Sequence, residues 1–129
     1  MTTNDKTIHL VLKHHWYDMI ASGKKPEKYR DFTPYWCRRF FRVRNDDGTT
    51  SKLDIEEKDL HKYQTQVYQL ACAGKLEVWP NAVKFQRAYP KNPPQMRIGI
   101  SSVDLGPCGK AEWGAIPGKW YIIIKLTKN

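Results

Sequence analysis

Residues 22–30, SGKKPEKYR, lie where a helical sequence pattern gives way to an extended one. On the N-terminal side, apolar residues recur at helical spacing over residues 14–22, and Gly23 stands where a left-handed residue would end a helix. On the C-terminal side, Pro26 opens an extended segment that runs to Phe32. The sequence therefore predicts a short helix, a tight turn and a strand in direct succession.

Strands are predicted on both sides of this unit. Apolar residues recur at every second position over residues 8–13, which indicates a strand with one buried face. Pro34 suits the first position of a short helix that runs through Phe41, with Thr33 as its N-cap. Three further strands are expected at residues 82–89, 95–104 and 120–126, and the Ile-Ile-Ile run in the last of them predicts a buried strand.

The middle of the chain predicts an insertion. Residues 45–48, NDDG, form a turn cluster, and from about Leu53 the sequence favours an amphipathic helix that Gly74 closes. The apolar residues of that helix are Leu60, Tyr63, Val67 and Leu70. Because 129 residues are within the usual size of one domain, we expect a single domain over residues 1–129 with an inserted segment at about 45–74.

The charge of the chain directs attention to polyanions. Lys and Arg number 22 against 13 Asp and Glu, which gives a formal net charge of +9. Such a charge attracts nucleic acid, although a basic surface also serves solubility alone. Five Trp and seven Tyr lie among the basic residues, as in YWCRR at residues 35–39. Aromatic faces stack bases while Arg and Lys hold phosphates, so the mixture suits single-stranded RNA or a nucleotide, with core packing and a solvated rim as the alternative.

Other classes of protein find little support in the sequence. Three widely spaced cysteines without a CxxC pair indicate reduced thiols rather than disulfides or a zinc site, and no metal is expected. No glycine-rich phosphate loop is present, and no cofactor is expected. No apolar run approaches the roughly 18 residues that span a bilayer, and the N-terminus lacks a signal-peptide pattern. We therefore expect a soluble, cytoplasmic protein without a membrane partner.

Two motifs resemble the ASCH family of the PUA-like superfamily, in the version met in small phage and bacterial proteins. The first is SGKKPEKYR at residues 22–30, and the second is Lys110-Ala111-Glu112-Trp113-Gly114, followed by Gly118 and a buried strand. The order of the predicted elements is similar as well. The resemblance implies an α+β fold, with a mixed β-barrel and two or three helices, one of them in the central insertion. It also implies a basic cleft that holds RNA or a nucleotide.

Candidate binding residues gather around the first motif. They are Lys24, Lys25, Lys28, Tyr29, Arg30, Arg38, Arg39, Lys84 and Trp113. In an extended segment alternate residues share a face, so Lys25 and Arg30 would point to opposite faces of one strand. The two side chains can face one ligand only if Lys25 belongs to the turn. Alternatively, Arg30 forms a salt bridge to Asp31 or Glu112, and Lys25 is an exposed turn lysine.

Three further functions remain open. Some ASCH proteins are amidohydrolases that deacylate N4-acetylated cytidine with a Lys, a Thr and a Glu, and by that resemblance Lys25 would be the nucleophile or base and Glu112 the acid or base. Lys28 stands where the family has its threonine. A ribonuclease that uses His14, His15 or His61 is also compatible with the family. Lastly, the helix in the insertion could make the chain a protein-interaction module.

Overall fold

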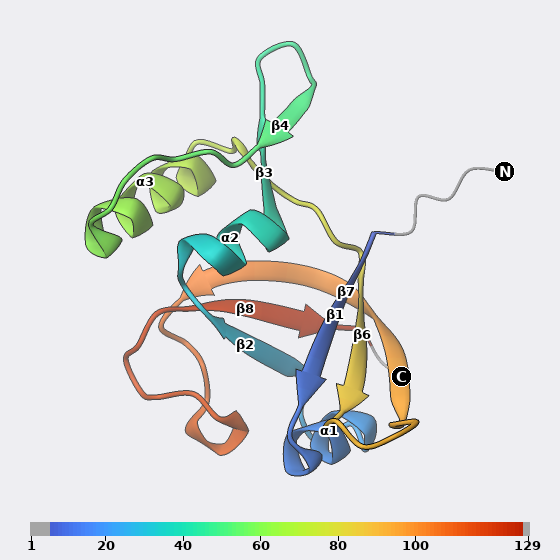
Figure 1. The fold of residues 1–129 in the computed structure, drawn as a ribbon. Helices are drawn as coiled ribbons and strands as arrows, with labels where there is room; N and C mark the ends of the chain where they lie inside the picture. Colours follow the sequence, from blue (N-terminus) through green and yellow to red (C-terminus); the bar gives the residue numbers. More distant parts are fainter. Residues whose placement is uncertain (1–5, 128–129) are drawn as a thin grey trace, which may run out of the picture.

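The computed structural model describes residues 6–127. Its main sheet is five-stranded, in the order β1-β6-β7-β8-β2. The strands are β1 (Thr7–Leu12), β2 (Glu27–Asp31), β6 (Ala82–Arg87), β7 (Gln95–Gly106) and β8 (Tyr121–Leu126). β1 and β6 are parallel, and the other neighbours are antiparallel. The sheet is mixed and curls strongly (Figure 1), and together with the helices it confirms the predicted α+β class.

The curl of the sheet is centred on β7. The first half of this strand pairs with β6 and the second half with β8, and the register shifts between Ile100 and Ser102. A bulge of this kind bends a strand and lets it pass around a corner. β1 and β2 remain the two edges of the sheet, so the domain contains an open half-barrel. Over residues 6–127 the sheet is a partial rather than a closed barrel, so the predicted mixed β-barrel is confirmed in part.

Two short helices flank β2. Helix α1 (His14–Ala21) is followed by Gly23 at φ 81°, the left-handed position predicted for it. Helix α2 (Pro34–Phe40) begins with the predicted cap, since the Trp36 N–H donates to Thr33 Oγ1 at 3.5 Å. Phe41 already belongs to the next strand, so α2 is one residue shorter than predicted.

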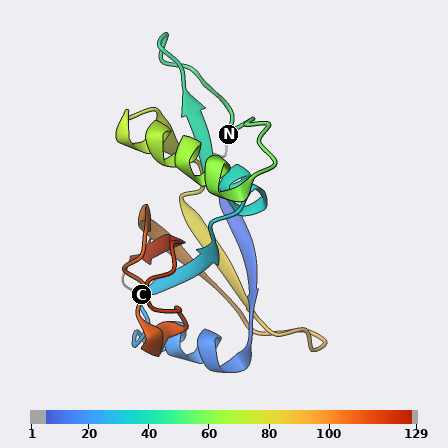
Figure 2. The same cartoon turned by 90° about the vertical axis from the view of Figure 1, so that its left-hand side faces the viewer.

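The central segment forms more structure than the sequence indicates. Strands β3 (Phe41–Arg44), β4 (Thr50–Lys52) and β5 (Leu76–Val78) make a second sheet in the order β4-β3-β5, and residues 45–48 turn between β3 and β4 as predicted. Helix α3 (Leu60–Cys72) starts seven residues after the predicted Leu53, because Asp59 caps it by accepting the Lys62 N–H at 2.9 Å. It ends before Gly74, at φ 71°. Figure 2 shows α3 and the β3–β4 hairpin above the curled sheet.

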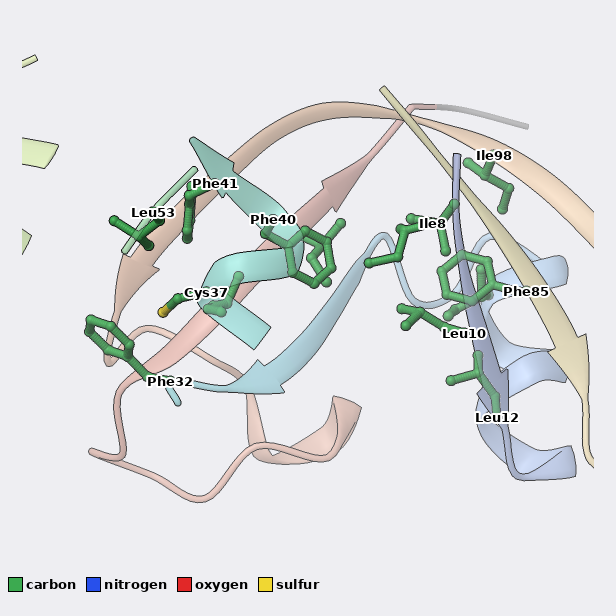
Figure 3. Packing of buried hydrophobic residues seen from close by; sticks show 14 of the residues in the cluster. Ile8, Leu10, Leu12, Phe32, Cys37, Phe40, Phe41, Leu53, Phe85 and Ile98 are labelled. Carbon is green, nitrogen blue, oxygen red and sulfur yellow. The ribbon is translucent and has the colours of Figure 1, made fainter. Parts of the chain in front are cut away.

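The main core fills the inner face of the half-barrel. Figure 3 shows Phe40 of α2 directed toward Ile8 of β1, with Leu10 and Phe85 beside them. The core also contains Leu53, Tyr63 and Val67 from the central segment, so α3 belongs to the same hydrophobic core as the main sheet. A smaller cluster of Tyr29, Ala115, Tyr121 and Ile123 lies on the other face, against Trp113. No helix in residues 6–127 is long and apolar enough to cross a membrane.

Candidate functional site

Strand β2 distributes its side chains between the two faces of the sheet. Lys28 lies opposite Ile124 and Arg30 opposite Ile122 in the register with β8. Residues directly opposite each other share a face, and both isoleucines are fully buried in the main core. Lys28 and Arg30 therefore project toward the inner face of the half-barrel, where charged side chains are rare.

Lys25 lies in the turn that precedes β2. Its backbone N–H donates to Met19 O at 3.1 Å, which ties the turn to α1. The side chain is only 1% exposed, and Nζ lies 4.1 Å from the centre of a Trp16 ring and 6.0 Å from that of Tyr29. Lys25 thus belongs to the turn and is buried, so the alternative of an exposed turn lysine is wrong.

The charges of the three cations repel one another, as their pKa values indicate. Burial lowers the pKa of Lys28 to about 7, and the charges of Arg30 and Lys25 add to the effect. Burial and the charge of Arg30 lower the pKa of Lys25 to about 8. Burial also lowers the pKa of Arg30, against the opposing attraction of Asp31. We call Lys25, Lys28 and Arg30 the cation cluster.

Carboxylates near the cluster are engaged elsewhere. Glu27 accepts a hydrogen bond from the Tyr29 hydroxyl at 2.7 Å, and Asp31 pairs with Lys119 at 3.1 Å. Within residues 6–127, no ion pair joins a carboxylate to the cation cluster. The alternative of a salt bridge from Arg30 to Asp31 or Glu112 is therefore wrong.

Arg30 is left with unused hydrogen-bonding capacity. Its Nη1 donates to the Tyr29 carbonyl at 3.3 Å, but its buried Nε has no hydrogen-bond partner. A buried donor without a partner is unfavourable, and a guanidinium presents a planar set of donors that matches phosphate or carboxylate oxygens. The cation cluster is therefore suited to an anionic ligand.

Aromatic rings adjoin the cluster. Besides Trp16 at Lys25, the Trp36 ring lies 5.0 Å from Arg30 Cζ. On the surface of α2, Arg39 Cζ lies 5.5 Å from the rings of both Trp36 and Tyr35. This row of alternating cations and rings leads from the inner face of the sheet to the surface of α2.

A pocket of about 420 Å³ lies at the predicted turn. It is lined by residues 20–23, Lys25, Pro26, Ile98, Leu126 and Thr127. Lys25 is the charged residue in this lining, so the pocket gives a ligand space beside one end of the cation cluster.

Other predicted residues lie on the opposite face from Lys28 and Arg30 or on another strand. Tyr29 is on the outer face, where its hydroxyl accepts the Lys110 N–H at 3.1 Å, and burial raises its pKa to about 12. Trp113 also packs on the outer face, below Lys110 Nζ at 4.6 Å. Lys84 is exposed on β6, which β7 and β8 separate from β2 in the sheet order. Trp113 and Lys84 therefore do not join the cluster, and Tyr29 adjoins it only at Lys25, whose Nζ lies 6.0 Å from the centre of the Tyr29 ring.

The remaining predicted residues are all exposed. Lys24 lies in the turn, Arg38 and Arg39 on α2, and Glu112 in the short helix η1 (Ala111–Trp113). The charge of Glu112 contributes to the raised pKa of Tyr29, but no hydrogen bond or ion pair joins it to Lys25 in the described part of the chain. Among residues 6–127, no three His, Cys, Asp or Glu side chains form a group that could hold a metal ion.

The sequence did not single out Trp16 and Trp36 as site residues. Trp36 had a usable signal, because Tyr35 and Trp36 precede Arg39 by four and three residues on a helix, and such pairs are neighbours on the helix surface. No sequence pattern pointed to Trp16, since its contact with Lys25 depends on how the turn folds back on α1.

Comparisons with protein-family models, with curated proteins and with solved structures found no match for this chain. The ASCH resemblance therefore stays a prediction, and the chemistry of the site has to be judged from its own residues.

Proposed function

We propose that this chain binds RNA or a nucleotide, with a phosphate group held by the cation cluster. The observation that carries the proposal is the absence, within residues 6–127, of any carboxylate paired with Lys25, Lys28 or Arg30, together with the unpartnered Nε of Arg30. Partly desolvated cations without a paired carboxylate are unfavourable in the free protein. A phosphate supplies both the negative charge and the acceptor oxygens that they lack.

Aromatic neighbours favour a nucleotide over a simple inorganic anion. Trp16 lies against Lys25 and Trp36 against Arg30, so a ring is present on each side of the cluster. Bases stack on such rings while adjacent cations hold the backbone. The net charge of +9 adds a field that draws polyanions to the surface. The same ligand class follows from the ASCH resemblance of residues 22–30 and 110–114, and we propose an ASCH-type domain on that ground.

Calorimetric titration with uridine monophosphate and with uridine tests this proposal. The wild-type chain should bind the monophosphate more tightly than the nucleoside. Arg30→Met should weaken monophosphate binding by about 10- to 100-fold, because hydrogen bonds to charged groups contribute about 1.5–3 kcal/mol. Lys84→Met, which removes an exposed lysine on β6, is the matched control and should bind as the wild type does. Equal affinity for nucleotide and nucleoside would contradict the proposal.

A second candidate, the amidohydrolase, rests on the lowered pKa values of Lys28 and Lys25, about 7 and about 8. At neutral pH, part of each population is then a neutral amine, which can act as a nucleophile or base. Hydrolysis of N4-acetylcytidine would consume one water and release cytidine and acetate.

Incubation with N4-acetylcytidine tests the second candidate. Cytidine release that is lost in Lys25→Ala while the fold is intact would support the enzyme. No release, together with salt-sensitive binding of single-stranded RNA, would contradict it and leave the binding function.

A further inference from the structure

A second pocket lies at the opposite end of β2 from the Lys25 turn. Its volume is about 640 Å³, within the range of ligand sites. Phe32 and Thr33 form one side, Leu60, Gln64 and Tyr68 of α3 form another, and Lys119 and Trp120 close it from the loop before β8. In Figure 1, α3 stands above the point where β2 ends and β8 begins. We call it the Trp120 pocket.

Exposed aromatic side chains gather at this pocket. The rings of Tyr68 and Trp120 meet edge to face, with centroids 5.3 Å apart. Leu60 is 47% exposed, Tyr68 43% and Trp120 39%, so three of the six most exposed large apolar residues of the described chain line one pocket. Apolar surface that is concentrated in this way marks a binding site.

Polar groups at the pocket favour a ligand with hydrogen-bonding edges over an aliphatic chain. The Gln64 amide donates to Phe32 O at 2.9 Å, and its oxygen accepts no hydrogen bond from the described residues. The Asp31–Lys119 ion pair, at 3.1 Å, supplies an exposed acceptor and an exposed donor. A planar base combines a stacking face with such polar edges.

Strand β2 connects this pocket to the cation cluster. Arg30 belongs to the cluster, and the next two residues, Asp31 and Phe32, line the Trp120 pocket. From Lys25 to Phe32 the chain covers about 20 Å at the rise of an extended strand. A ligand that reaches from Lys25 to the Trp120 pocket is therefore longer than one nucleotide.

We propose that the ligand is single-stranded RNA several nucleotides long, with a phosphate at the cation cluster and an unpaired base stacked on Trp120. This inference rests on the proposed function. A protein partner would also match an aromatic pocket, but the adjoining cluster of unpaired cations and the net charge of +9 favour RNA.

Affinities for uridine monophosphate and for octauridylate test the inference. They are measured on the wild type and on Trp120→Ala, Tyr68→Ala, Lys28→Met and Arg30→Met. The wild type should bind octauridylate more tightly than the monophosphate. Trp120→Ala should weaken octauridylate binding by about 5- to 100-fold, the range of stacking on one base, and leave monophosphate binding unchanged. Tyr68→Ala should act in the same direction. Tyr89→Ala removes an aromatic residue that is 84% exposed and does not line the pocket, so it is the matched control.

The outcomes separate this inference from the proposed function. If the monophosphate binds in an Arg30-dependent manner but neither pocket variant weakens octauridylate binding, the RNA inference fails and the pocket is left to a protein partner. If neither the monophosphate nor octauridylate binds, both proposals fail. If octauridylate depends on Trp120 but not on Lys28 or Arg30, the placement of a phosphate at the cation cluster is overturned.

Discussion

Lys28 is a charged residue on the inner face of a β-sheet, opposite the fully buried Ile124. Its ammonium is partly desolvated and repelled by Arg30 and Lys25, which lowers its pKa to about 7. Such a residue destabilises the free protein and stabilises a complex with an anion. Local features that oppose folding are expected where a binding site requires them.

Lys28→Met should therefore raise the melting temperature at pH 7 while it weakens nucleotide binding. Methionine is similar in length, lacks the charge and suits an apolar face. Thermal unfolding of the two proteins measures the effect. Lys84→Met is the control, since a change at an exposed surface position usually stays within about 0.5 kcal/mol. A lower melting temperature for Lys28→Met would mean that the ammonium has a stabilising partner.

The pKa values of Lys28 and Lys25 also predict how stability varies with pH. In the unfolded chain both lysines titrate at about 10.5, whereas in the folded chain they titrate at about 7 and about 8. From about pH 7 to about pH 9 the unfolded state binds more protons, so the free energy of unfolding rises with pH. Above about pH 9, Cys37 opposes this trend, because burial raises its folded pKa from 9.0 to about 12. Melting temperatures across this range give the slope, and Lys28→Met should reduce it.

Ligand affinity should fall as the pH rises, whereas the free energy of unfolding rises. A bound phosphate favours the charged lysines, so binding takes up protons when the free lysines are partly neutral. Affinity for uridine monophosphate should fall as the pH rises from about 7 to about 9, above the phosphate's own second pKa of about 6. Titration at several pH values measures this. Constant affinity over the range would exclude Lys25 and Lys28 from the site.

Cys37 gives an independent test of the core. Its thiol is fully buried and burial raises its pKa, whereas Cys72 and Cys108 are exposed. A thiol reagent at neutral pH should modify Cys72 and Cys108 quickly and Cys37 only after denaturant is added, because the thiolate is the reactive form. Mass spectrometry of the modified protein identifies the sites. Rapid modification of Cys37 in the folded protein would contradict the packing of α2.

At the scale of elements, α3 is part of the main core. Tyr63 and Val67 are buried there together with Leu53, so deletion of residues 53–74 would remove core residues as well as a surface. The predicted interaction role of this segment is untested, and surface substitutions on α3 would address it without opening the core.

Asp59→Ala should destabilise the domain by about 1 kcal/mol, since the carboxylate accepts the Lys62 N–H at the start of α3. Asp59→Asn retains an acceptor at that position and should change stability less. Urea denaturation measures both variants. If Asp59→Ala leaves the unfolding midpoint unchanged, α3 does not unfold together with the half-barrel.

Short elements explain much of what the sequence did not predict. The strands β3, β4 and β5 have three or four residues each, too few for an alternating pattern to stand out. The start of α3 was misplaced because residues 53–59 contain helix-compatible Glu and Lys, while the cap at Asp59 decides the boundary. In contrast, local backbone chemistry predicted the helix boundaries correctly, with left-handed glycines after the C-terminal ends at Gly23 and Gly74 and a cap at the start at Thr33.

At the scale of the whole molecule, the order of the main strands along the chain was predictable from the residue pattern, and the corner in the sheet was not. Alternation fixes which face of a strand is buried, but the corner in β7 depends on a register shift between Ile100 and Ser102. For the site, alternation correctly separated Tyr29 from Lys28 and Arg30. The Trp120 pocket was missed because its walls come from segments far apart in the sequence, such as Phe32, Tyr68 and Trp120.

The net charge of +9 predicts a strong dependence of RNA binding on salt. Each phosphate neutralised by a Lys or Arg releases counterions, so the logarithm of the affinity should fall linearly with the logarithm of the salt concentration. Arg30→Met should reduce the magnitude of this slope by about 1, whereas Trp120→Ala should lower affinity with little change in slope. Octauridylate titrations at several salt concentrations check both. An unchanged slope for Arg30→Met would remove Arg30 from the phosphate contacts.

Nuclear magnetic resonance of the lysine ammonium groups tests the cation cluster most directly, by following the titration of Lys25 and Lys28 with and without ligand. In the free protein, Lys28 should titrate at about pH 7 and Lys25 at about pH 8. Uridine monophosphate should raise both pKa values and uridine should not, because only the phosphate adds negative charge. Values near 10.5 in the free protein, or values that the monophosphate leaves unchanged, would contradict a phosphate site at Lys25, Lys28 and Arg30.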